Sequence, residues 1–359
     1  MSARIRPDLE SIPAYAPGRS SPGAVKLASN ESTFGPLPSV AKAIAEETEL
    51  LNRYPDNGSG ELRAALAQFH GVEIANVVIG CGSVALCQEL VQITCSSPED
   101  EVLFGWRSFE AYPIVTQIGH ATSVQVPLDA EYTHDLDAMA AAVTDRTRLV
   151  FVCNPNNPTG TAHGRGALIR FLDAIPDHVV VALDEAYYEY LRLPEADHPN
   201  GIEIGRGRPN VVVLRTFSKA YGLAGLRAGY AVGDPELITA LLKVHIPFSV
   251  NRLAQVAAIA CLQARHELLE RTDHVVAERD RMRAALAAAG YRVPPSHANF
   301  VWLPLGAASA DFGAASAEAG VLVRPYGTDG VRVTAGDPHE NDRFLAFATA
   351  PETVARFVG

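Results

Sequence analysis

The feature that most constrains the fold is a series of short apolar runs that alternate with helical segments. The runs have strand length and lie at residues 77–80, 101–105, 123–128, 148–153, 178–184 and 210–217. Runs that are apolar on both faces and are separated by helices are typical of a mostly parallel sheet in an α/β domain. Residues 224–233 add a further predicted strand, and helical spacing predicts helices at 39–54 and 60–70.

The pattern changes on both sides of this α/β unit. The first 35 residues are rich in Pro, Ser and Gly, which favours an arm over a core element. After about residue 245, a long interrupted helical stretch precedes short predicted strands at 298–305, 320–326 and 330–336 and a final helix at 341–349. The predicted organisation is an arm at 1–38 that joins the small domain, a large domain at 39–244 and a small α+β domain at 245–359.

Composition excludes several classes of protein. With 48% hydrophobic and 20% charged residues, the chain has the composition of a soluble globular protein. The net charge of -11 argues against nucleic-acid binding, which needs a basic surface. We find neither an apolar secretory segment nor a run long enough to span a membrane, so we expect a cytoplasmic protein. The 5 cysteines form no C-x-x-C pair and the 11 histidines form no H-x-x-x-H, so we expect free thiols and no metal.

Polar residues follow most of the predicted strands, where α/β sheets bind ligands. They lie at Gly82-Ser83, Trp106 to Phe109, Asn154 to Gly160, Asp184 to Tyr187 and Thr216 to Lys219. Lys219 follows an apolar strand, and Arg227 lies eight positions later. A partly buried lysine beside a cation is a better nucleophile toward carbonyl groups, because its charged form is disfavoured. The spacing alone leaves an ordinary surface lysine equally open.

Three motifs, in this order and spacing, resemble the fold-type I aminotransferases that depend on pyridoxal 5'-phosphate. They are NPNNPTG at 154–160, VALDEAY at 181–187 and TFSKAYGLAGLRAGY at 216–230. The resemblance runs nearly end to end and lies within the histidinol-phosphate aminotransferase branch. Segments such as GCGSVALCQ and FGWRSFEAYP are most similar to the neighbouring aromatic amino acid (phenylalanine) aminotransferases. The resemblance implies a large domain with a mostly parallel central sheet, a smaller α+β domain and pyridoxal phosphate as the cofactor.

The resemblance also implies roles for residues around the cofactor ring. Lys219 would bind the cofactor covalently and move a proton at the substrate Cα. Asp184 would pair with the pyridine nitrogen, Tyr187 and Asn157 would bind the ring O3′, and Phe109 would stack on the ring. The residues alone leave a helix cap open for Asp184 and a core position open for Phe109.

The implied phosphate site combines the N-terminus of a helix with three side chains. A helix N-terminus favours an anion through its free N–H groups and its dipole. The implied phosphate ligands are Gly82, Ser83, Val84, Thr216, Ser218 and Arg227.

The remaining implied residues concern the substrate and a second subunit. Tyr54 would reach the phosphate of a neighbouring subunit, which implies a homodimer, although the residues of NRYPDNG taken alone favour a helix-ending turn with a packed tyrosine. Arg332 would bind the substrate carboxylate, and Arg324 is a second candidate for the same anion. Asn30 and Tyr15 on the arm would close over the substrate.

We therefore predict ping-pong transfer of an amino group between phenylalanine, tyrosine or tryptophan and a 2-oxo acid such as 2-oxoglutarate. Histidinol-phosphate transamination is the alternative. A decarboxylase or C–S lyase on the same fold is disfavoured, because a carboxylate near the ring plane on Arg332 favours loss of the Cα proton over loss of CO2. A transcription regulator would need an added N-terminal helix-turn-helix module, which we do not find. No nucleic-acid or membrane partner is expected.

Overall fold

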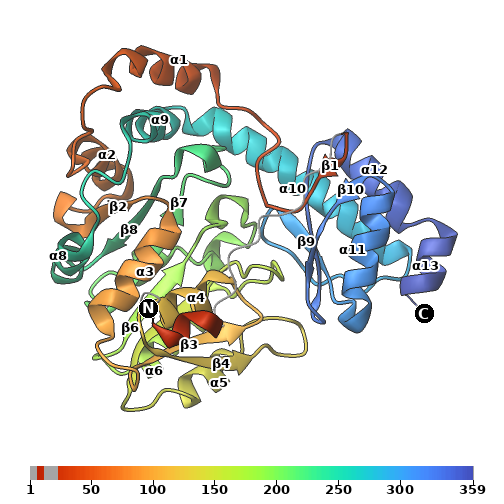
Figure 1. Cartoon of the computed structure of the whole chain (residues 1–359), viewed down its shortest axis with the longest axis horizontal. Helices are drawn as coiled ribbons and strands as arrows, with labels where there is room; N and C mark the ends of the chain where they lie inside the picture. The colour runs from red at the N-terminus through yellow and green to blue at the C-terminus, as the bar shows by residue number, and fades with distance from the viewer. Residues whose placement is uncertain (1–5, 12–22, 359) are drawn as a thin grey trace, which may run out of the picture.

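The computed structural model describes residues 6–11 and 23–358, which form two lobes connected by a long helix (Figure 1). That helix, α10 (Arg265–Ala288), runs from the larger lobe to the smaller one, which contains the C-terminus. In the described part of the chain, no helix is long and apolar enough to cross a membrane.

A seven-stranded sheet forms the centre of the large lobe, in the order β2-β8-β7-β6-β5-β3-β4. Its strands are β2 (Val77–Gly80), β3 (Glu101–Trp106), β4 (Thr122–Pro127), β5 (Thr147–Cys153), β6 (Val180–Asp184), β7 (Val211–Thr216) and β8 (Gly229–Gly233). Only β8 runs against its neighbours, β2 and β7, and the other pairs are parallel. The predicted mostly parallel α/β sheet is therefore confirmed.

Helices of the described residues precede, interleave with and follow these strands. They are α1 (Pro38–Glu46), α2 (Gly60–His70), α3 (Ser83–Thr94), α4 (Ala111–Ile118), α5 (Leu136–Ala141), α6 (Arg165–Ala174), α7 (Gly201–Ile204), α8 (Pro235–Val244) and α9 (Arg252–Gln263). The predicted domain boundary at 244/245 coincides with the end of α8 and stays a prediction. Just beyond it, α9 packs against α1 and α2 in the large lobe.

Two boundaries of the predicted elements are wrong. The predicted helix at 39–54 ends at Glu46, and only a short 3-10 helix follows at Thr48–Leu50. Leu50 and Leu51 are exposed, so no buried face stabilises a longer α-helix here. The predicted strand at 224–233 begins only at Gly229. Before it, the chain forms a short 3-10 turn and then a left-handed residue, Arg227, with φ of 62°.

The small lobe contains a three-stranded antiparallel sheet in the order β11-β12-β9. Its elements are β9 (Phe300–Leu303), β10 (Val321–Leu322), β11 (Arg324–Tyr326), β12 (Gly330–Thr334), α11 (Ser309–Glu318), α12 (Pro338–Ala348) and α13 (Pro351–Phe357). The arm joins this lobe, since β1 (Val25–Lys26) pairs in parallel with β10. Helix α11 was not predicted from the sequence. The helix predicted at 341–349 is α12, and a further helix, α13, follows it.

Candidate active site

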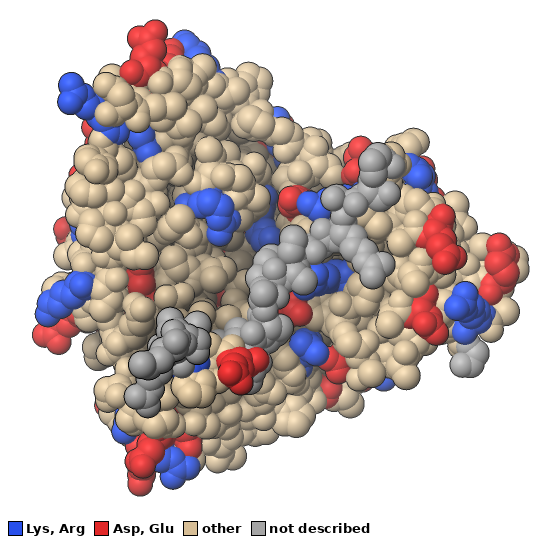
Figure 2. Space-filling view, in the orientation of Figure 1, with Lys and Arg blue, Asp and Glu red and all other residues tan. Residues whose placement is uncertain are grey.

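A cavity of about 710 Å³ lies where the carboxyl ends of the large-sheet strands meet the small lobe and the arm. This volume is within the range of small-molecule binding sites. Figure 2 shows Lys and Arg side chains in the hollow between the lobes. The cavity is lined by twelve of the predicted residues: Ser83, Val84, Phe109, Asn157, Asp184, Tyr187, Thr216, Ser218, Lys219, Arg227, Arg324 and Arg332.

Lys219 enters this cavity from the loop after β7. Its Nζ donates a hydrogen bond to the Ser29 carbonyl of the arm at 3.4 Å. The same atom lies 5.8 Å from the centre of the Tyr187 ring. The amine is thus placed between the arm and the large lobe, facing the space where a ligand would lie.

Burial lowers the pKa of Lys219 to about 7, and the positive charges of Arg332 and Arg227 act in the same direction. The carboxylates of Glu31 and Asp184 oppose this shift. An amine with this pKa exists partly in its neutral, nucleophilic form at neutral pH. The sequence suggested Arg227 as a cation near Lys219. The structure adds a second cation, Arg332, which lies far away in the sequence.

Asp184 ends β6 with a carboxylate that is 2% exposed. The Tyr112 hydroxyl donates to its Oδ2 at 2.7 Å, and the Ala186 N–H donates to its Oδ1 at 3.2 Å. Burial raises the pKa of Asp184, and these two hydrogen bonds oppose the rise. Tyr112 is itself fully buried and stacks on Phe151 with ring centres 4.5 Å apart.

Sequence reasoning missed Tyr112, although a signal was available. The residue lies three positions after Phe109, in the first turn of α4, and their rings meet edge to face at 5.6 Å. An aromatic residue one helical turn from a predicted ring-stacking residue is a candidate for its support.

The N-terminus of α3 forms the anion-binding end of the cavity. Gly82 is the N-cap with φ of 75°, and Ser83 and Val84 begin the helix. Their N–H groups belong to the first turn, which has no acceptor within the helix. A Cβ atom at Gly82 would collide with the Arg227 guanidinium, so only glycine lets this cation approach the turn.

Side chains from the loop after β7 complete this end. Arg227 Nη1 donates to Ser218 Oγ at 3.3 Å and to the Ala224 carbonyl at 3.1 Å. Thr216 Oγ1 accepts the Ser218 N–H at 3.1 Å. Hydroxyl groups, open backbone N–H groups and a guanidinium therefore converge, a set that favours a phosphate-like anion.

Arg332 lies on β12 and connects the small sheet to the large lobe. Its Nη1 donates to Asn157 Oδ1 at 2.5 Å and to the Tyr326 hydroxyl at 2.7 Å, while Nη2 donates to the Ala28 carbonyl at 2.7 Å. Because Asn157 accepts with its oxygen, its amide NH2 is available to the cavity that it lines.

Arg324 pairs with Arg332 in the antiparallel register of β11 and β12. Its Nη2 donates to the Glu110 carboxylate at 3.2 Å, and both residues line the cavity. The second arginine of the site is thus already engaged by an acid.

Of the predicted site residues that the structure describes, Gly82, Asn30 and Tyr54 are not among those that line the cavity. Asn30 is buried behind Tyr187, to whose hydroxyl its amide donates at 2.8 Å. Tyr54 is 78% exposed and stacks on Phe248 at 4.6 Å. Tyr15 lies outside the described residues.

Glu185, to which the sequence analysis gave no role in the site, has a structural partner. Its carboxylate accepts from Arg215 Nε and Nη2 at 2.9 and 2.7 Å, and from the Gly201 N–H at 2.7 Å. Both charged side chains are buried. Among the described residues, His, Cys, Asp and Glu form no group that could hold a metal ion.

The chain is similar to known proteins over nearly its whole length. The profile of the family "Aminotransferase class I and II" matches residues 22–347, and the chain belongs to this family. It is 78% identical over 357 residues to the aromatic amino acid aminotransferase of Nocardia farcinica, covering 99% of this chain and 100% of that one. It is 61% identical over 350 residues to the protein of that name from Mycobacteroides abscessus, covering 98% of this chain and 99% of the other.

Among solved structures, it is similar to the histidinol-phosphate aminotransferase from Sinorhizobium meliloti in complex with pyridoxal-5'-phosphate. The two share 30% identity with a TM-score of 0.89, over 99% of each chain. The predicted fold-type I aminotransferase family is thus confirmed.

The lowered pKa of Lys219 predicts a pH-dependent cost of folding. Between the folded pKa of about 7 and the unfolded value of 10.5, the unfolded chain binds more protons at this position. The free energy of unfolding of the apoenzyme therefore falls as the pH drops from 10.5 to 7. Below pH 7 the destabilisation by Lys219 has reached its full value. Lys219→Met apoenzyme should show a higher free energy of unfolding in urea than wild type at neutral pH, with the difference shrinking toward pH 10. Lys42→Met, on an exposed side chain, is the matched charge control, and a Lys219 difference that does not change with pH would contradict the assignment.

Proposed function

We propose that this chain is a pyridoxal-phosphate-dependent aminotransferase that exchanges the amino group of an aromatic L-amino acid with a 2-oxo acid. One observation carries the proposal. A single cavity presents an anion cradle, a buried carboxylate and an amine with a pKa of about 7.

The chemistry of these groups fits the separate parts of the cofactor. The N-terminus of α3 with Arg227 suits a phosphate ester, and Lys219 suits an aldehyde. The Asp184 carboxylate suits a protonated pyridine nitrogen, because each group favours the charged form of the other. The amide of Asn157 and the hydroxyl of Tyr187 suit the ring oxygen.

When bound, pyridoxal phosphate supplies an electron sink for the negative charge left at the substrate Cα. The chain's own residues do the rest. The Lys219 amine acts first as a general base that takes the proton from Cα and then, once protonated, as a general acid. A pKa near neutrality suits both roles. Arg332 binds the substrate carboxylate with a planar guanidinium, which fixes the orientation of the Cα–H bond. The hydrogen bonds that Tyr112 and Ala186 donate to Asp184 favour its ionised form and oppose the effect of burial.

The proposed aromatic preference rests on the side wall of the cavity and on the relatives. Helix α4 and the segment before it contribute an apolar wall, formed by Phe109, Ala111, Ile114, Val115 and Ile118. The relatives that share 78% and 61% identity are named aromatic amino acid aminotransferases. The second arginine, Arg324, is paired with Glu110, and this carboxylate would repel the phosphate of histidinol phosphate. Histidinol phosphate appears in the name of a more distant structural neighbour, at 30% identity.

Steady-state kinetics test the proposed substrate. We expect kcat/KM for phenylalanine to exceed that for histidinol phosphate by about 100-fold with 2-oxoglutarate as acceptor. One lost contact between substrate and pocket is worth ~1–3 kcal/mol, and the two substrates differ in several contacts. Arg332→Lys should raise KM for phenylalanine, because an ammonium cannot bind the carboxylate with two parallel bonds. Lys42→Arg is the matched control on an exposed face. A preference for histidinol phosphate would replace the aromatic proposal with the alternative.

We further propose that the active form is a homodimer in which Tyr54 reaches the phosphate site of the neighbouring subunit. Tyr54 is far more exposed than a packed tyrosine, and exposed apolar residues lie close to it in the chain or close in the chain to Phe248, on which it stacks. They are Leu50, Leu51, Ile246 and Phe248. An exposed apolar patch of this kind favours contact with another protein surface.

Mixing two defective variants tests the shared site. In a heterodimer of Tyr54→Phe and Lys219→Ala subunits, one site regains both native side chains and the other loses both, by two-fold symmetry. At limiting pyridoxal phosphate, an equilibrated mixture should therefore be more active than the average of its parents. Tyr132→Phe in place of Tyr54→Phe is the control. Activity equal to the parental average would contradict the contribution of Tyr54 across the interface.

A further inference from the structure

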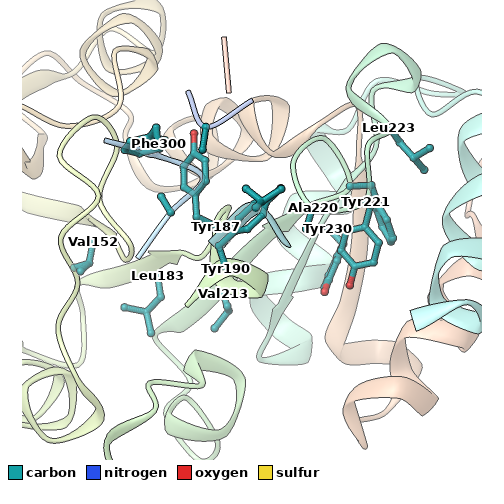
Figure 3. Close-up of a cluster of buried hydrophobic side chains, with 14 of the residues drawn as sticks. Val152, Leu183, Tyr187, Tyr190, Val213, Ala220, Tyr221, Leu223, Tyr230 and Phe300 are labelled. Carbon is teal, nitrogen blue, oxygen red and sulfur yellow. The ribbon is translucent and has the colours of Figure 1, made fainter. Parts of the chain in front are cut away.

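The Tyr187 hydroxyl is anchored from the small lobe and the arm. Its ring packs edge to face on Phe300 of β9, with centres 5.2 Å apart (Figure 3). Its oxygen accepts a hydrogen bond from Asn30 Nδ2 at 2.8 Å. Tyr187 lines the cavity, and no acceptor for its own O–H is present among the described residues.

Asn30 is fixed in turn by Thr334 on β12. The Asn30 backbone N–H donates to Thr334 Oγ1 at 3.0 Å, and Thr334 Oγ1 donates to Asn30 Oδ1 at 3.0 Å. The side chains of Asn30, Thr334 and Tyr187 are all buried. Asn30 adopts a left-handed conformation with φ of 55°, which asparagine tolerates better than most residues and which brings its N–H and its side chain to the same hydroxyl.

These bonds have only one consistent direction. A backbone N–H can only donate, so the Thr334 oxygen is an acceptor there and its single hydrogen must go elsewhere. Asn30 Oδ1 is its one acceptor in the described part of the chain. The oxygen of the Asn30 amide therefore faces Thr334 and the NH2 group faces Tyr187. Tyr187 accepts from that NH2 group, which leaves its hydrogen for the cavity.

We propose that Asn30 and Thr334 are positioning residues that orient the Tyr187 hydroxyl so that it donates its hydrogen into the cavity. The inference rests on the proposed function, in which the acceptor is the ring oxygen of pyridoxal phosphate. It also replaces the predicted role of Asn30, which was direct contact with the substrate.

Two further observations support this role. Burial raises the pKa of Tyr187 well above the neutral range, so the phenol keeps the hydrogen that it would donate. Thr334 and Arg332 lie on the same face of β12, two residues apart. One strand of the small sheet thus reaches both residues proposed to bind the ring oxygen: Arg332 contacts Asn157, and Thr334 reaches Tyr187 through Asn30.

The direction of the bond can be reversed by one isosteric change. Asn30→Asp replaces the NH2 donor with an oxygen, so Tyr187 would donate to the introduced carboxylate and turn its hydrogen away from the cavity. The readouts are the affinity of the apoenzyme for pyridoxal phosphate and the pH midpoint of the visible absorbance of the loaded enzyme. We expect about tenfold weaker cofactor binding, as for loss of a hydrogen bond, and a midpoint shifted toward that of Tyr187→Phe. In the double variant that combines Asn30→Asp with Tyr187→Phe, the shift of the midpoint should be little larger than in Tyr187→Phe alone.

A neutral pair of variants separates direction from charge. Thr334→Val removes the hydroxyl that fixes the amide, and Thr334→Ser keeps it. Thr334→Val should shift the midpoint as Tyr187→Phe does, and Thr334→Ser should restore it. Thr272→Val, which removes a buried hydroxyl outside the cavity, controls for general destabilisation. Circular dichroism of each apoenzyme verifies folding, and if Thr334→Val does not fold, the comparison of Asn30→Asp with Tyr187→Phe decides.

The outcomes separate the two proposals. If Tyr187→Phe shifts the midpoint but Asn30→Asp and Thr334→Val leave it at the wild-type value, the positioning role is wrong. Effects of Asn30→Asp and Tyr187→Phe that add fully would also overturn it, because residues acting through one bond do not add. If the wild-type protein neither binds pyridoxal phosphate nor transfers amino groups, the proposed function itself fails.

Discussion

The site depends on the lowered pKa of the Lys219 amine, which is partly neutral at neutral pH although other charged side chains line the same cavity. Lys219 loses hydration on burial and faces Arg332 and Arg227, and its pKa falls to about 7 as a result. Asp184 and Glu31 limit that fall. The large sheet places the amine and Asp184 at the carboxyl ends of β7 and β6, which are hydrogen-bonded neighbours. Parallel pairing is therefore what fixes the separation between the proposed base and the proposed partner of the pyridine nitrogen.

The small lobe and the arm do more than cover this edge of the sheet. β12 contributes Arg332, whose contacts extend to Asn157 in the large lobe and to the arm backbone at Ala28. Arm residues also accept from Lys219 and donate to Tyr187. The cavity is consequently assembled from segments that lie far apart in the chain, and any motion of the small lobe would act on the same groups that are proposed to contact the cofactor.

The sequence predicted those parts of this arrangement that are encoded locally. Apolar runs located all seven strands of the large sheet, and the motifs around Lys219, Asp184 and Asn157 located the polar groups of the cavity at the carboxyl ends of these strands. The end of α1 and the start of β8 were missed, because they depend on exposure and on a left-handed residue at Arg227. Tyr112 and Thr334 were missed as well, because their importance comes from partners far away in the sequence, Asp184 and Asn30. Periodicity does not report such pairings.

Borohydride reduction of the protein loaded with pyridoxal phosphate, followed by peptide mapping, tests the central claim most directly. The reagent makes a lysine-bound aldehyde permanent, so the labelled residue identifies the amine that holds the cofactor. The account predicts label on Lys219 alone, and loss of the visible or near-ultraviolet absorbance band in Lys219→Ala. Label on Lys26, Lys42 or Lys243, or no label at all, would contradict it.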